Sequence, residues 1–126
     1  MKPFRTFLTQ HPLETPRNHP ALLEDLLETA LAGKQDCVDK AITMIEDLQL
    51  HGSNCRFIKP LAGAVMELKA RTDDGGARVY FFRVAEDAFA LGRFECKKET
   101  ATNQQLLYWT AQVAMLYAKG QTEVIL

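Results

Sequence analysis

Residues 63–84, GAVMELKARTDDGGARVYFFRV, contain two strand-like segments separated by a turn. AVMELKAR alternates apolar and polar residues, and ARVYFFRV is rich in β-branched and aromatic residues. TDDGG between them carries the aspartates and glycines of a tight turn. The stretch therefore predicts an antiparallel hairpin, and it carries several cations although the chain has a formal net charge of −1.

The alternation divides the hairpin side chains between two faces, because successive residues of a strand point to opposite sides. A two-residue turn centred on Asp74-Gly75 predicts the pairs Arg71–Arg78, Lys69–Tyr80 and Leu68–Phe81. A turn of odd length with a bulge would change this register. The face expected to pack on helices carries Leu68, Val79 and Phe81. The face expected to meet solvent carries Lys69, Arg71, Arg78 and Tyr80.

Helical periodicity appears before and after the hairpin. A first helix is expected after the N-cap residue Asn18, ending before Gly33. A second should run from about Gln35 to Leu50, and a last helix lies within residues 102–120. The first helix should bury Leu22, Leu23, Leu26, Leu27, Ala30 and Leu31. The second should bury Val38, Ala41, Ile42, Ile45 and Leu48.

Three further segments complete the predicted fold. KPFRTFL, residues 2–8, favours a short edge strand, and FALGRFECK, residues 89–97, extends the hairpin into a three-stranded meander. QTEVIL, residues 121–126, either frays or adds a short strand. The order predicts a single domain, residues 1–126, of the α+β class. Its helical hairpin and C-terminal helix should pack on one face of a small antiparallel sheet.

Composition limits the function classes. The hydrophobic fraction of 47% and charged fraction of 25% are those of an ordinary globular protein. The three cysteines show no metal-ligand spacing, and we interpret them as inert thiols in a cytoplasmic protein without a metal or other cofactor. No apolar run approaches membrane-spanning length. The three histidines lie in or beside predicted turns, and we expect no catalytic role for them.

Cations concentrate around the meander. Residues 56–98 contain 9 lysines and arginines against 6 acids. Lysines and arginines are common on a sheet face that meets solvent, so solubility explains their presence as well as ligand binding does. An anion-binding surface is the alternative, and Tyr80 and Phe82 add aromatic area on which a base could stack.

The motif order resembles a known family. IEDLQLHG, FIKPLAGAVMELKAR, ARVYFFR and RFECKK, followed by an alanine-containing helix, are similar to the RelE/ParE superfamily of bacterial toxins. The HigB-like, phage-associated branch of that superfamily shows the same succession of motifs. The resemblance covers roughly residues 38–118. It implies a RelE-like fold, with a helical hairpin and a C-terminal helix on a β-sheet.

The resemblance also implies a function. RelE- and HigB-like toxins cleave mRNA, generally on the ribosome and without a metal, and each is paired with an antitoxin, here expected to be a helix-turn-helix protein. By this likeness the residues expected to act in catalysis are Lys69, Arg78 and Lys97. Those expected to contact RNA are Lys59, Arg71, Tyr80, Arg93 and Lys98, and Tyr117 is a further candidate acid.

RNA cleavage of this kind suits basic residues. One group must take the proton of the 2′-hydroxyl, another must protonate the departing 5′-oxygen, and cations must stabilise the charged phosphorane. Two alternatives remain open on the sequence. The chain could be a non-catalytic or degenerate phage-derived binding module, or a ParE-like inhibitor of DNA gyrase.

Overall fold

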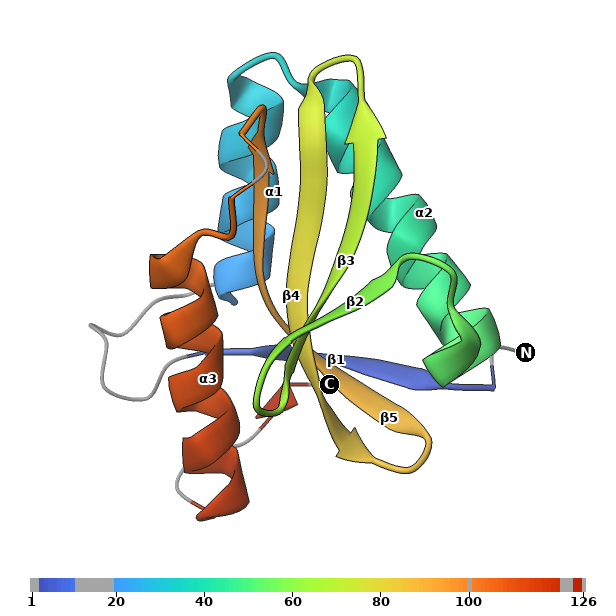
Figure 1. The fold of residues 1–126 in the computed structure, drawn as a ribbon, viewed down its shortest axis with the longest axis vertical. Coiled ribbons are helices and arrows are strands. Elements are labelled where there is room, and N and C mark those ends of the chain that lie inside the picture. The colour runs from blue at the N-terminus through green and yellow to red at the C-terminus, as the bar shows by residue number, and fades with distance from the viewer. Residues whose placement is uncertain (1–2, 11–19, 100, 121–123, 126) are drawn as a thin grey trace.

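The computed structural model describes residues 3–10, 20–99, 101–120 and 124–125, and shows an α+β fold (Figure 1). Its strands are β1 (Arg5–Thr9), β2 (Ile58–Ala62), β3 (Val65–Thr72), β4 (Gly75–Ala85), β5 (Ala88–Lys97) and β6 (Val124–Ile125). Its helices are α1 (Ala21–Leu31), α2 (Gln35–His51) and α3 (Gln104–Ala118), with a 3-10 turn at Gly52–Asn54. The predicted α+β class is therefore confirmed.

The sheet is mixed, and the expectation of a purely antiparallel sheet is wrong. Its strand order is β2-β3-β4-β5-β1-β6. β1 runs parallel to β5, whereas β6 pairs antiparallel with β1. β2 adds an edge strand beside β3 that the alternation did not predict, because its five residues include Pro60, which cannot donate to a ladder. Which strands pair with β1 depends on long-range packing and not on local pattern.

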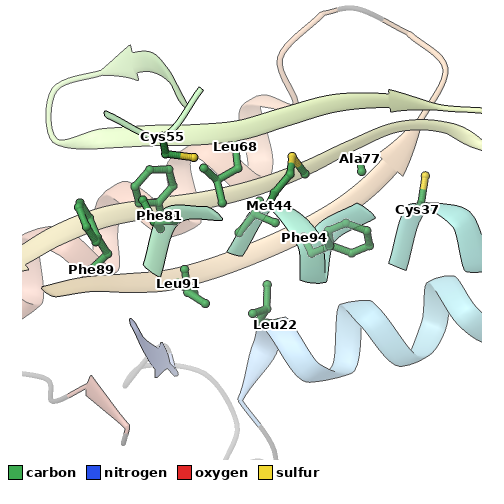
Figure 2. Close-up of a cluster of buried hydrophobic side chains, with 13 residues drawn as sticks. Leu22, Cys37, Met44, Cys55, Leu68, Ala77, Phe81, Phe89, Leu91 and Phe94 are labelled. Atoms are coloured by element: carbon green, nitrogen blue, oxygen red, sulfur yellow. The ribbon is translucent and has the colours of Figure 1, made fainter. Parts of the chain in front are cut away.

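Helices cover both faces of the sheet, so the expectation that they share one face is wrong. The main core, between the sheet and α1 and α2, includes Leu22, Met44, Leu48, Leu68, Val79, Phe81, Phe89, Leu91 and Phe94 (Figure 2). A second cluster joins Trp109 and Val113 of α3 to Phe82 and Ala90. Figure 1 shows α2 and α3 on opposite sides of the strands. Coverage by α3 explains why the aromatic Phe82 lies on the same face as the cations.

The leucine stripe of α1 is only partly buried. Leu22 is buried, but the exposed fractions of Leu23, Leu27 and Leu31 are 44%, 59% and 78%. Ile42 of α2, also expected in the core, is 48% exposed. α1 packs along β5, where the Asp25 carboxylate accepts a hydrogen bond from the backbone N–H of Phe94 at 3.0 Å. The helix therefore directs a polar residue and only part of its apolar stripe towards the sheet.

Helix boundaries lie close to those expected. α1 begins at Ala21, directly after Pro20, and ends near Gly33, whose φ of +81° suits glycine. The expected N-cap, Asn18, lies outside the described residues. α2 continues through His51, and Asn103 caps α3 by accepting hydrogen bonds from two backbone N–H groups.

The hairpin turn lies one residue earlier than expected, so the predicted register is wrong. Thr72 pairs with Gly75, which makes the two aspartates the central residues. Thr72 Oγ1 accepts from the Asp74 backbone N–H at 3.1 Å and donates to the Gly75 carbonyl at 2.8 Å, closing the turn. The observed pairs are Lys69–Arg78, Arg71–Gly76 and Leu68–Val79. Each residue of β3 therefore pairs with a β4 residue two positions earlier than expected. A shift of two residues keeps every side chain on the same face, so the predicted division into two faces is confirmed.

Two of the three cysteines form a disulfide, which corrects the expectation of inert thiols. Cys37 near the start of α2 is bonded to Cys96 near the end of β5. The two residues are 59 positions apart in sequence, and no spacing rule joins them. Cys55 is a buried free thiol.

Candidate functional site

Three rows of side chains cross the sheet on the face that α3 partly covers. The first row carries Arg71, Gly76 and Lys97, and the second carries Lys69, Arg78 and Glu95. The third carries Glu67, Tyr80 and Arg93, with Lys59 of β2 opposite Glu67. Cations from four different strands therefore lie in neighbouring rows, although the chain as a whole is slightly acidic.

The first row, together with Lys69 and Arg78 of the second, lines a depression of about 60 Å³, here called the basic pocket. Its lining residues are Lys69, Ala70, Arg71, Gly76, Arg78, Lys97, Lys98 and Glu99. The volume corresponds to about four waters, roughly the space of one phosphate group. Gly76 contributes by lacking a side chain, because a Cβ there would lie 3.2 Å from the Lys97 carbonyl oxygen. Five of the eight sequence-predicted site residues thus meet in one place.

Arg78 contributes a buried cation to the pocket. Its side chain is 1% exposed, so the expectation that it faces solvent is wrong. Its guanidinium donates to the carbonyl oxygens of Ala101 at 3.0 Å and Glu99 at 2.5 Å. Its Nε is buried and has no hydrogen-bond partner within the described part of the chain. Arg78 is thus a fixed positive charge with a donor still unused.

Lys69 of β3 is half-buried and lies directly opposite Arg78 of β4. Burial lowers the pKa of its ammonium group, and the neighbouring Arg78 charge lowers it further. Glu67 opposes this change in part. A lysine with a lowered pKa has a larger neutral fraction near neutral pH, and can then accept a proton.

Glu67 is a buried carboxyl that was not predicted as a site residue from the sequence. Burial raises its pKa, while the charges of Arg78, Lys69 and Lys59 oppose the rise. Its Oε2 has no hydrogen-bond partner among the described residues. Its parity on β3 already placed it beside the cations, but parity alone does not predict its burial.

Replacing Glu67 with glutamine is expected to raise Tm near neutral pH. Because the folded-state pKa exceeds the unfolded value of 4.5, this group's stabilisation is present below pH 4.5 and is lost as the pH rises through the folded-state pKa. Glutamine cannot ionise, so the gain should be on the order of 1 kcal/mol at neutral pH and should vanish in acid.

Thermal unfolding of Glu67→Gln at several pH values measures this effect. Glu86→Gln, the same substitution at an exposed residue, provides the control. A lower Tm for Glu67→Gln at neutral pH would contradict the prediction, and would mean that the surrounding cations stabilise the carboxylate more than burial destabilises it.

Tyr80 is buried and not available for base stacking, so its expected solvent exposure is wrong. Its hydroxyl donates to Glu95 Oε2 at 2.5 Å, and burial together with this carboxylate raises its pKa. Asn103 Nδ2 donates to the other oxygen of Glu95 at 3.2 Å. The network joins β4, β5 and the start of α3, and so holds the segment that supplies the carbonyl partners of Arg78.

The other predicted RNA contacts lie outside the pocket. Arg93 forms an ion pair with Asp25, with Nε–Oδ2 and Nη2–Oδ1 distances of 2.7 and 3.0 Å, and stacks over Trp109. Lys59 is exposed on the edge strand β2. Tyr117 packs against Phe82, with ring centroids 6.2 Å apart, and does not line the pocket.

Replacing Asp25 with asparagine is expected to destabilise the fold by about 2 kcal/mol, because the charged hydrogen bonds to Arg93 are lost in a largely buried place. Asp87→Asn is the matched control. Its pair with Arg5 is exposed, with side-chain exposures of 57% and 59%, and we expect no measurable change. Urea unfolding of both variants measures the difference. Equal effects would show that the Asp25 pair contributes no more than a surface contact.

The histidines and metal-ligating residues form no second site in the described ranges. His51 Nε2 lies 3.7 Å from Asp47 Oδ1 at the end of α2, and the other two histidines, His11 and His19, lie outside the described residues. Within residues 3–10, 20–99, 101–120 and 124–125, no three His, Cys, Asp or Glu side chains are placed to share a metal ion. Over the same ranges, no helix combines the length and apolar character needed to cross a membrane.

The fold and the site together define an α+β protein with a phosphate-sized basic pocket on a mixed sheet. Comparison of the chain with models of protein families and with curated protein sequences finds no match. The likeness to RelE-type toxins therefore rests on the sequence motifs.

Proposed function

We propose that the basic pocket binds the backbone phosphate of single-stranded RNA, and that the protein is a toxin-like, metal-independent endoribonuclease of the RelE/HigB type. The observation that carries the proposal is the convergence of Lys69, Arg71, Arg78, Lys97 and Lys98 on one phosphate-sized space. Lysine and arginine side chains are the usual donors to phosphate oxygens, and a group of them neutralises the backbone charge.

The proposed reaction needs only groups that line the pocket. Neutral Lys69 takes the proton of the 2′-hydroxyl, and the 2′-oxygen attacks the adjacent phosphorus. The bond to the 5′-oxygen breaks, Lys97 donates a proton to that oxygen, and the products are a 2′,3′-cyclic phosphate and a 5′-hydroxyl. Arg78 supports the proposal as a fixed donor to the phosphorane, because its guanidinium is already positioned by two carbonyl groups.

The first test is expression of the chain alone in bacteria, followed by mapping of mRNA 5′ ends. Growth arrest with new 5′-hydroxyl ends is expected, and co-expression of a cognate antitoxin should relieve it. The second test uses purified protein with RNA, in the presence and absence of ribosomes. A 2′-deoxy substitution at the cleaved nucleotide should abolish cleavage and preserve binding. Normal growth with soluble protein and intact mRNA would refute the endoribonuclease proposal.

A second candidate is a phosphate-binding module that does not cleave RNA. It is favoured by the engagement of Arg78 with two backbone carbonyls, which already uses part of its hydrogen-bonding capacity. This candidate expects RNA binding that falls with salt, and no 2′,3′-cyclic products. A gyrase supercoiling assay separates it from a ParE-like activity.

A further inference from the structure

The Cys37–Cys96 disulfide lies directly beneath the basic pocket. In the register of β4 and β5, Ala77 pairs with Cys96 and Gly76 pairs with Lys97. Successive strand residues point to opposite faces, so Cys96 faces α2 and Lys97 faces the pocket. Figure 2 shows the Cys37 side chain extending from α2 towards the sheet, on the side of Ala77. One covalent bond therefore anchors the strand residue that precedes the two pocket lysines.

The end of β5 pairs with β4 as far as Lys97, and Tyr80 and Asn103 hold Glu95, but the edge of β5 that faces away from β4 has fewer restraints. In the described pairings, β1 accompanies β5 only from Ala88 to Leu91. Beyond that point the Asp25 carboxylate accepts from the Phe94 backbone N–H. The chain then leaves the sheet, and within a few residues the carbonyl groups of Glu99 and Ala101 bind Arg78. A displacement of the end of β5 would thus move Lys97 and also the partners of Arg78.

The first turn of α2 is itself fixed to the β3–β4 turn. The Asp36 backbone N–H donates to Asp74 Oδ2 at 3.0 Å, which caps a helix start that lacks a side-chain cap from its own N-cap residue. Cys37 Sγ lies 3.3 Å from Thr72 Oγ1 and 3.6 Å from the Gly75 carbonyl oxygen. The disulfide thus ties the end of β5 to an already ordered platform.

We propose that the thiol–disulfide state of Cys37 and Cys96 controls the anion affinity of the basic pocket. The oxidised protein holds Lys97, Lys98 and the carbonyl partners of Arg78 in their binding arrangement. The reduced protein holds the end of β5 less firmly, through its pairing with β4 alone at Cys96 and Lys97, and binds phosphate groups more weakly. The inference rests on the proposed function only in treating the pocket as a phosphate site, and does not require RNA cleavage.

The reduction is a two-electron exchange with a dithiol such as dithiothreitol. A thiolate of the dithiol attacks Cys96 Sγ, because Cys96 is partly exposed and Cys37 is fully buried. The bond between the two protein sulfurs breaks, and Cys37 Sγ leaves with the electron pair and takes a proton. The second thiol of the reagent then displaces Cys96 as a thiolate, which is also protonated. The reagent ends as a cyclic disulfide.

The experiment first counts thiols in denatured protein purified without reductant. One thiol is expected, and three after reduction, because only Cys55 is free in the oxidised chain. Calorimetry then measures binding of inorganic phosphate, and fluorescence anisotropy measures binding of a short labelled single-stranded RNA, in both states. Reduction should weaken the binding of phosphate and of RNA by about tenfold each, because the loosened end of β5 must be ordered on binding. Hydrogen exchange of the Lys97 and Lys98 amides should rise on reduction.

Two sets of variants act as controls. Cys37→Ser/Cys96→Ser should bind like reduced wild type and should not respond to reductant. Cys55→Ala should retain the full redox response. Burial raises the pKa of the Cys55 thiol to about 11, so this thiol stays protonated and does not take part in exchange. Far-UV circular dichroism and Tm must show that the reduced protein remains folded.

The outcomes separate this inference from the proposed function. Weaker phosphate binding by the reduced protein supports the inference, whether or not RNA is bound. If RNA is bound in neither state, the proposed RNA function is wrong. RNA binding or cleavage that is equal in both states overturns the inference and leaves the function standing. Three free thiols before reduction, no phosphate binding in either state, or global unfolding on reduction would also overturn it.

Discussion

Replacing Lys69 with alanine is expected to slow RNA cleavage by about 10²–10⁴-fold, the usual contribution of a positioned general base. Lys69 lies in the pocket opposite Arg78, and burial and that charge lower its pKa. The wild-type rate should therefore rise with pH over a range that lies below the ordinary lysine value of 10.5. The rate should fall as the pH decreases and Lys69 becomes protonated.

Two further variants define what Lys69 does. Lys69→Arg keeps the positive charge but stays protonated, so it should bind RNA and still fail to cleave it. Lys119→Ala removes the same charge from the far end of α3, where Lys119 is exposed, and should cleave normally. The measurement is single-turnover cleavage of labelled RNA, with Tm as a check on folding. Normal cleavage by Lys69→Ala would place the base elsewhere.

The largest effect on stability is expected in the main core. Leu68 of β3 is fully buried in the main core (Figure 2). Strand parity places it on the opposite face from Lys69. Leu68→Ala should cost about 3 kcal/mol, because the lost transfer free energy is joined by the cost of a cavity. At roughly 4 °C for each kcal/mol, Tm should fall by about 12 °C.

Leu31→Ala is the matched control for Leu68→Ala. The substitution removes the same atoms from a leucine that is 78% exposed at the end of α1. Its effect should lie within about 0.5 kcal/mol of zero. Urea unfolding of both variants gives the comparison. Similar losses would mean that the leucine stripe of α1 is buried in solution, as its periodicity alone predicts.

Leu68 and Leu31 show what a local sequence pattern can predict about burial and what it cannot. Alternation assigned Leu68 and Lys69 to opposite faces of β3, and that assignment holds because parity is a property of the strand itself. Helical periodicity grouped Leu31 with Leu22, but only Leu22 is buried. Periodicity identifies an apolar face, whereas the partner that covers the face lies elsewhere in the chain.

Some features of the candidate site can likewise be predicted from the sequence, and others cannot. The sequence alone indicates that Lys69, Arg71 and Arg78 share one face of a hairpin, and that basic residues follow on the next strand. It does not reveal that Arg93 is held by Asp25, because the two residues are 68 positions apart. It also does not reveal the burial of Glu67, which depends on how the rest of the chain packs around β3.

By itself, the sequence determined the α+β class, the three helices, the central meander and the division of its side chains between two faces. These features follow from periods of 3.6 and 2 residues and from turn chemistry, which act over short stretches of chain. Only the tertiary structure decided the parallel pairing of β1 with β5, the placement of helices on both faces and the Cys37–Cys96 bond. Each joins segments that are distant in sequence, and their contact depends on how the whole core packs.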